Sequence, residues 1–98
     1  MAIYKWDFKV NQNHTLEVDH PFKGNITIQL DDKKIHESEA HELTHDFRVE
    51  ERYFQLQVKF ENQNFGIAQM QTWAHYLFMY HDGNWEEQTM IGSYYNSE

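Results

Sequence analysis

Hydrophobic and polar residues alternate along much of the chain, and this period of two predicts half-buried β-strands. In the first run, over residues 4–10, aromatic and aliphatic side chains occupy every second position between Lys and Asp. Shorter runs of the same kind lie at residues 15–19 and 26–30. The longest run spans residues 52–60, where Gln and Lys separate Phe54, Leu56, Val58 and Phe60.

Polar segments separate these runs and predict turns. Asp82-Gly83 has aromatic residues on both sides, which is typical of a tight hairpin turn. The segments 11–13, 31–34 and 61–64 are rich in Asn, Asp, Gln and Lys and are predicted turns as well. Strands at a spacing of about twelve residues favour an all-β domain. We therefore expect a mainly β fold over a single domain, residues 1–98, as a small antiparallel sandwich or barrel of seven to eight short strands.

Two segments fit both a helix and a strand. Ala40, Leu43 and Phe47 recur at helical spacing, which predicts a short helix near 38–47. Leu43, Phe47 and Val49 equally fit the alternation of a strand. Residues 65–74 show the same ambiguity, because no residue after Gly66 interrupts a helical pattern. Helix or strand stays open for 38–48 and 65–74, and an α+β fold is the alternative.

The charge balance and the amino-acid composition exclude several classes of function. The 98 residues include 8 Lys or Arg against 16 Asp or Glu, which gives a net charge of −8. This balance argues against nucleic-acid binding, which needs clustered Lys and Arg, and favours a protein partner with a basic surface. The chain has no Cys, so thiol catalysis and Cys-ligated zinc are excluded. No apolar run reaches the length of about 18 residues that a membrane span needs, and we expect a cytoplasmic protein.

One short motif has a catalytic interpretation. His41-Glu42-Leu43-Thr44-His45 fits the pattern H-E-x-x-H, in which two histidines on one helix face hold Zn²⁺. These five residues resemble the zinc motif of the thermolysin-like zincins. The resemblance implies His41 and His45 as metal ligands and Glu42 as the general base of a zinc-dependent hydrolase.

Beyond these five residues the chain departs from the zincin patterns. The positions of the Gly and the third His of a metzincin hold Arg48 and Glu51. Glu61 lies at a conceivable distance for the third ligand of a gluzincin, but it falls in a predicted turn. The zinc hydrolase is therefore an alternative. We expect no cofactor and no catalytic residue, with zinc as the one metal to consider.

Two surfaces are candidates for partner binding. Residues 37–51 contain six acidic residues and a single basic one, Arg48. Residues 73–85 are rich in aromatic side chains, which anchor many protein interfaces. We expect a small acidic binding or inhibitor module without catalytic activity. Its predicted partner-binding residues are Glu37, Glu39, Glu42, Asp46, Trp73, Tyr76 and Trp85.

A second resemblance concerns the order of segments. An acidic-basic turn at 31–35, a DFRV segment at 46–49, a long alternating strand and an LFMYHDG segment at 77–83 follow one another. This rhythm resembles the Fas apoptotic inhibitory molecule domains and implies a β-sandwich that acts by binding. It assigns no site residue. A barrel that binds a small molecule within its aromatic residues is a further alternative, and the oligomeric state stays open.

Overall fold

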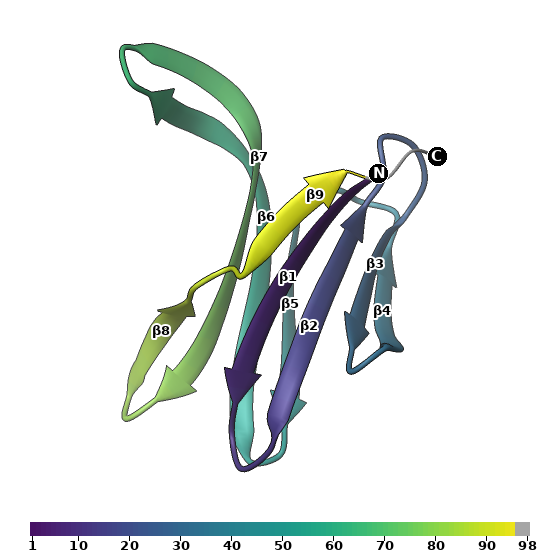
Figure 1. The fold of residues 1–98 in the computed structure, drawn as a ribbon, viewed down its shortest axis with the longest axis vertical. Helices are drawn as coiled ribbons and strands as arrows, with labels where there is room; N and C mark the ends of the chain where they lie inside the picture. Colours follow the sequence, from purple (N-terminus) through teal and green to yellow (C-terminus); the bar gives the residue numbers. More distant parts are fainter. Residues whose placement is uncertain (96–98) are drawn as a thin grey trace.

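The computed structural model describes residues 1–95 and contains nine β-strands within them. They form two antiparallel sheets, in the orders β4-β3-β2-β1-β9 and β5-β6-β7-β8, which pack face to face (Figure 1). The predicted small antiparallel sandwich is confirmed, with nine strands in place of seven to eight. The strands are β1 (Ala2–Lys9), β2 (Asn13–His20), β3 (Ile26–Leu30), β4 (Lys33–Ser38), β5 (Leu43–Val49), β6 (Arg52–Phe65), β7 (Ala68–His81), β8 (Asn84–Gln88) and β9 (Gly92–Tyr95).

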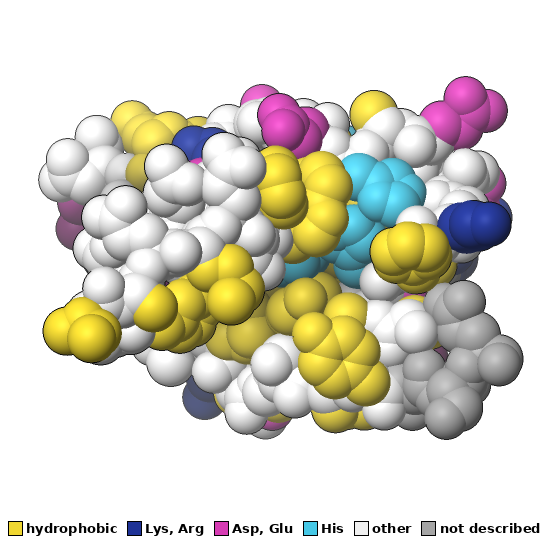
Figure 2. Space-filling model, turned by 90° about the horizontal axis from the view of Figure 1, so that it is seen from above, with side chains coloured by type: hydrophobic (Ala, Val, Ile, Leu, Met, Phe, Trp, Pro, Cys, Tyr) yellow, Lys and Arg dark blue, Asp and Glu magenta, His cyan; other side chains and the backbone are white. Residues whose placement is uncertain are grey.

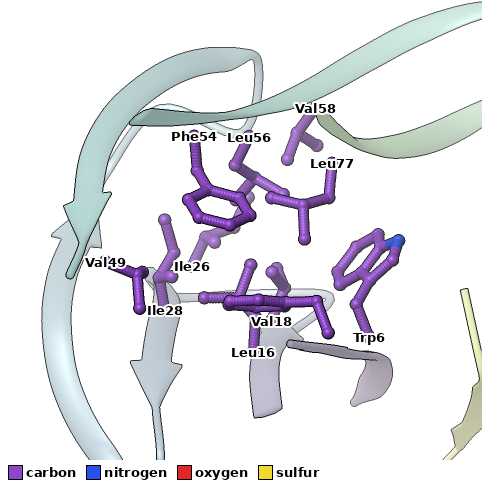
Figure 3. Packing of buried hydrophobic residues seen from close by; sticks show 11 residues of the cluster. Trp6, Leu16, Val18, Ile26, Ile28, Val49, Phe54, Leu56, Val58 and Leu77 are labelled. Atoms are coloured by element: carbon purple, nitrogen blue, oxygen red, sulfur yellow. The ribbon is translucent and has the colours of Figure 1, made fainter. Parts of the chain in front are cut away.

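The core lies between the two sheets, and the alternating positions of the sequence build it. Trp6 of β1 is opposite Leu16 of β2 in one sheet, and Leu56 of β6 is opposite Leu77 of β7 in the other. Full burial of such side chains stabilises a fold by about 1.5–3 kcal/mol each. Figure 3 shows the two inner faces in contact through Trp6, Leu16, Val18, Ile26, Ile28, Val49, Phe54, Leu56, Val58 and Leu77.

Both ambiguous segments consist of strand and turn, and no helix is present among residues 1–95. The short helix considered near 38–47 is wrong: β4 ends at Ser38, residues 39–42 bend, and β5 begins at Leu43. Pairing with β6 gives the backbone of β5 partners along its whole length, while Leu43 and Phe47 pack against the core. Nothing among the described residues therefore forms a helix that could cross a membrane.

The predicted turn at 61–64 is also wrong, because β6 and β7 run past the sandwich as a paired hairpin. Their register extends to Phe65 opposite Ala68, and the chain turns at Gly66, whose φ is +64°. We call residues 62–72 the arm. Figure 1 shows the arm curving away from both sheets. It is paired through the backbone of its two strands, so it is an ordered projection and not a loop.

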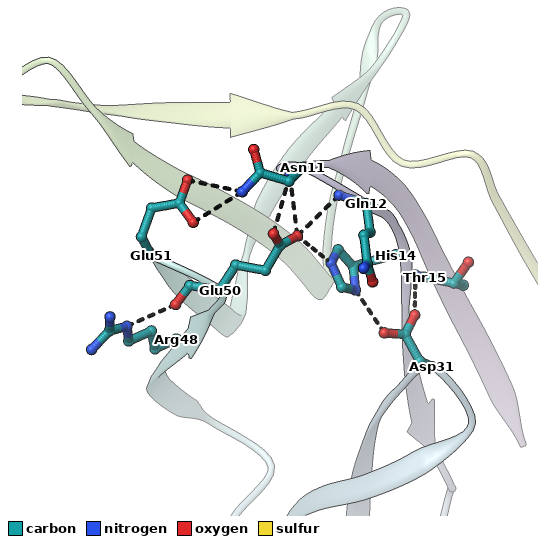
Figure 4. Close-up of polar contacts among 8 residues, drawn as sticks. All are labelled: Asn11, Gln12, His14, Thr15, Asp31, Arg48, Glu50 and Glu51. Atoms are coloured by element: carbon teal, nitrogen blue, oxygen red, sulfur yellow. Dashed lines mark hydrogen bonds and ion pairs between the residues drawn. The ribbon is translucent and has the colours of Figure 1, made fainter.

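Glu50 ties the two sheets together at the end of the sandwich opposite the arm (Figure 4). It lies in the turn between β5 and β6, and its carboxylate accepts hydrogen bonds from the backbone amides of Asn11 and Gln12, both at 3.1 Å. The same carboxylate bonds His14 Nε2 at 2.8 Å. His14 Nδ1 in turn bonds Asp31 at 2.7 Å. The imidazole of His14 therefore joins turns that belong to both sheets.

Candidate functional site

Three histidines from separate parts of the chain meet near the base of the arm. His20 ends β2, His75 lies in β7, and His41 lies in the bend between β4 and β5. His20 Nδ1 is 2.9 Å from His75 Nε2, and His20 Nε2 is 3.0 Å from His41 Nδ1. His41 Nε2 is 2.7 Å from the backbone oxygen of Gly24. We call the three residues the histidine chain.

The carbonyl of Gly24 determines which nitrogens carry protons in the neutral histidine chain. A carbonyl only accepts, so His41 donates through Nε2–H. A neutral imidazole carries one N–H, so His41 Nδ1 accepts from His20 Nε2–H, and His20 Nδ1 accepts from His75 Nε2–H. All three rings are therefore Nε2–H tautomers. The one nitrogen outside these three bonds is Nδ1 of His75.

Burial favours the neutral forms of His20 and His75. His20 and His75 are only 6% and 7% exposed. Burial, and then the nearby His41, lower the pKa of His20 to about 4. Burial, and then His20, lower the pKa of His75 to about 3. This agrees with the bond pattern, because a charged His20 would carry an N–H that faces the N–H of His75.

Aromatic rings surround the histidine chain. Tyr4 of β1 stacks on His75, with ring centroids 3.6 Å apart and an angle of 20° between the planes. Trp73 of β7 lies with its centroid 5.0 Å from His20 and 6.0 Å from His41. Phe60 of β6 packs on Trp73, with ring centroids 5.0 Å apart. The rings of the histidine chain are therefore held in place by neighbours from both sheets.

An open pocket of about 430 Å³ lies over the histidine chain. Phe22 stands at this pocket with 88% of its surface exposed, and Tyr95 with 84%. Figure 2 shows the histidine side chains in a hollow between hydrophobic side chains on this face of the molecule. The pocket is lined by Met1, Ala2, Tyr4, His20, Pro21, Phe22, His41, Thr72, Trp73 and Tyr95.

The bond pattern limits what the histidine chain can do chemically. Metal binding needs an imidazole nitrogen with a free lone pair, and in His20 and His41 both nitrogens are engaged. Among residues 1–95, no group of three or more His, Asp or Glu side chains is arranged to hold a metal ion. Lowered pKa values also make His20 and His75 weak bases at neutral pH.

The H-E-x-x-H residues are separated by the fold. His41 belongs to the histidine chain, whereas His45 lies in β5 and stacks on His36 of β4, with centroids 3.9 Å apart. Glu42 lies in the bend, beside Phe60 at the base of the arm. The zinc hypothesis requires a helix that turns both histidines to one face, and this helix is absent from residues 1–95.

The acidic candidates lie on the edge strands and the bend between them. Glu37 of β4 accepts hydrogen bonds from Asn25 at 2.9 Å and from Lys34 at 3.3 Å. Asp46 of β5 accepts one from Gln55 at 2.8 Å. The remaining two, Glu39 and Glu42, are exposed in the bend.

The aromatic candidates do not share one surface. Trp73 faces the interior with His75, because residues two apart on a strand point the same way. Tyr76 lies on the opposite face of β7, where its hydroxyl donates a hydrogen bond to Glu61. Trp85 of β8 is 45% exposed and packs on Tyr80, with centroids 5.3 Å apart. Trp73 therefore belongs to the pocket, and Tyr76 and Trp85 to the outer face of the sheet.

Sequence reasoning missed the residues that complete the histidine chain. His75 carries a usable signal, since the alternation of β7 places it on the same face as Trp73 and Leu77. His20 carries a weaker signal, because it lies at the end of a predicted strand and directly before Pro21. Their contact is set by how the two sheets pack, which no local pattern encodes.

Comparisons with known proteins add no relative to this description. No protein-family model, no curated protein and no solved structure matches the chain. The function is therefore inferred from the surfaces and side chains of this molecule alone.

Proposed function

We propose that this protein is a binding module without catalytic activity that docks through its arm on a protein partner with a basic surface. The observation that carries the proposal is the arm itself. It is a projecting hairpin that exposes apolar side chains and contains no charged residue, in a chain whose net charge is −8. A cytoplasmic location is part of the proposal, since the chain has no Cys.

The apolar side chains of the arm contribute little to the core. Ile67 at the turn is fully exposed, and Phe65 and Met70 are 54% and 59% exposed. Exposed apolar side chains that cluster on a projection are typical of interaction sites. They supply the anchors that bury against a partner.

The edges of the arm support the same proposal. β5 pairs with β6 only as far as Val58, and β8 pairs with β7 only from Leu77 onward. Both strands of the arm therefore present an edge of backbone donors and acceptors outside those pairings. Proteins commonly protect such edges with Lys or Pro, and residues 62–72 contain neither. An extended strand of a partner fits such an edge.

Acidic side chains at the base of the arm favour a basic partner. Glu42 and Glu61 line a shallow hollow together with Phe60, which is 44% exposed. Lys59 is the basic residue in this lining. An apolar anchor beside carboxylates matches an apolar groove that has Lys or Arg at its rim. Complementary charge of this kind speeds association and makes its rate depend on salt.

The test uses a photo-crosslinking amino acid in place of Ile67, in extracts of the native cells. A matched control carries the same amino acid in place of Ile91, an exposed apolar residue outside the arm. The protein captured from position 67 alone is then purified, and its affinity for the unmodified chain is measured. We expect Ile67→Asp to weaken this affinity at least tenfold, and Ile91→Asp to leave it unchanged.

Two outcomes would overturn the proposal. The first is equal loss of affinity in Ile67→Asp and Ile91→Asp, since the arm would then have no special role. The second is a dimer of the purified chain that light scattering detects and that Ile67→Asp dissociates. In that case the arm would bind a second copy and not a separate basic protein.

A further inference from the structure

We propose that the pocket over the histidine chain binds a small, planar, aromatic molecule that carries no positive charge. Thr72 at the end of the arm belongs to the lining of this pocket, but the inference does not depend on the docking function of the arm. Its volume of about 430 Å³ lies within the range of small-molecule sites, about 300–1,000 Å³.

The shape of the lining favours a flat ring. Trp73, His20 and His41 form the wall, and their planes are tilted by 59° to 84° against one another. Phe22 projects from the segment after β2 with little burial of its own, so its ring is available to pack on a ligand. Aromatic rings attract one another in stacked and edge-to-face arrangements.

The charge of the lining disfavours a cation. Among residues 1–95, the side chains of the lining include no carboxylate, and Met1, which carries the α-amino group, is one of the lining residues. A cationic ligand would lose its hydration in this pocket without gaining an opposite charge.

The hydrogen bonds of the lining define the polar contacts of the ligand. In His20 and His41 both nitrogens are engaged in hydrogen bonds, so the two rings offer their faces and edges to a ligand. The hydroxyl groups of Tyr4, Thr72 and Tyr95 remain as polar groups in the lining. A ligand with one or two hydrogen-bonding groups on an aromatic ring therefore fits best.

The experiment compares two probes that share one ring and differ in charge: indole, which is neutral, and tryptamine, which is a cation. Each probe is titrated without isotope label into ¹⁵N-labelled protein, and the side-chain N–H signal of Trp73 is followed by NMR. We expect saturable shifts with indole, with a Kd of about 1 mM or lower. Tryptamine should bind at least tenfold more weakly.

Two exposed phenylalanines provide a matched pair of variants. Phe22→Ala removes a ring at the pocket that is 88% exposed, so the fold is kept. Phe65→Ala removes an exposed ring in the arm. We expect the affinity for indole to fall at least tenfold in Phe22→Ala and to stay unchanged in Phe65→Ala.

Three results would overturn the inference. They are the absence of saturable shifts with indole, equal affinity for indole and tryptamine, and unchanged affinity in Phe22→Ala. Because no partner protein enters the titration, failure here leaves the docking function of the arm intact, and the reverse also holds.

Discussion

The carboxylate of Glu50 lies 2.8 Å from Nε2 of His14, and this contact joins two turns that belong to different sheets. His14 begins the strand after the first turn of one sheet, while Glu50 forms the turn between the first two strands of the other. Glu50 has a φ of +55°, a conformation that non-Gly residues adopt rarely. Its carboxylate is thereby directed at the neighbouring sheet and closes that end of the sandwich.

Removal of the imidazole should destabilise the protein. In His14→Phe a ring of similar shape can still stack on Phe8, but the bonds to Glu50 and Asp31 are lost. Hydrogen bonds to charged groups contribute about 1.5–3 kcal/mol, so we expect the free energy of unfolding in urea to fall by about 1–3 kcal/mol. His81→Phe is the control, because His81 contacts Glu86 at 3.3 Å at the exposed end of β7. An equal effect of both substitutions would contradict this role of His14.

The stabilising effect of the contact between His14 and Glu50 should decrease at both high and low pH. Hydrogen bonds to Asp31 and Glu50 raise the pKa of His14 above 6.5, so its stabilising effect is complete below pH 6.5 and is lost as the pH rises through the raised pKa. The bond from His14 lowers the pKa of Glu50 from 4.5 to about 2, so that effect is lost as the pH falls from 4.5 to about 2. The stability difference between wild type and His14→Phe should therefore be largest between pH 4.5 and 6.5. A stability difference between the two proteins that stays constant from pH 3 to 9 would disprove this prediction.

The stabilising effect of His20 and His75 should be lost at acidic pH only. His20 and His75 have pKa values of about 4 and about 3, both below the ordinary 6.5. Their contribution is fully present above pH 6.5 and is lost as the pH falls from 6.5 toward these values, since the unfolded chain takes up protons first. NMR titration should find both rings neutral at pH 5. Protonation of either ring near pH 6.5 would refute the bond pattern.

The tautomers provide an independent test. Long-range ¹H–¹⁵N spectra at pH 7 should show the Nε2–H form for His20, His41 and His75. In His20→Phe the Nε2–H of His75 and the Nδ1 of His41 lose their partner. Because His75 is buried, the loss of its bond alone should lower the free energy of unfolding by about 1–3 kcal/mol. An Nδ1–H form of His41 would mean that its Nε2 donates no hydrogen bond to the carbonyl of Gly24.

Core and arm should respond differently to the same chemical change. Leu77 is fully buried between the sheets, so Leu77→Ala should lower the free energy of unfolding by about 2–5 kcal/mol. Ile67 is fully exposed, and Ile67→Ala should change it by no more than about 0.5 kcal/mol. Urea denaturation measures both. Marked destabilisation by Ile67→Ala would show that the arm serves the fold and not a partner.

The alternation of hydrophobic and polar residues predicted burial correctly where the strands cover the core. Trp6, Phe54, Leu56 and Val58 are buried as their period of two predicts. The same rule fails at Phe60, which is 44% exposed, because β6 leaves the sandwich there and enters the arm. The Asn and Gln residues at 61–64 indicated a turn, but their pairing with β7 continues the hairpin. A composition that is typical of turns is therefore also compatible with a ribbon that is solvated on both faces.

The candidate site was harder to predict, for a physical reason. His41 was singled out through a helical spacing to His45, and the backbone there is a bend followed by a strand. Its actual partner, His20, is 21 residues away in sequence. His75 is 55 residues from His20, and their contact arises when the two sheets pack. Only a fold-level prediction of which strand ends lie together could have found this cluster.

The direction of the hydrogen bonds in the histidine chain has a consequence for proton movement. A proton hops along imidazoles only if every ring can afterwards exchange the roles of its two nitrogens. The carbonyl of Gly24 cannot donate, so His41 cannot reverse without giving up its bond at 2.7 Å. The three ring dipoles are therefore locked head to tail, and the row of imidazoles is a poor conductor of protons. Three histidines in hydrogen-bond contact therefore hold the fold together here and do not relay protons.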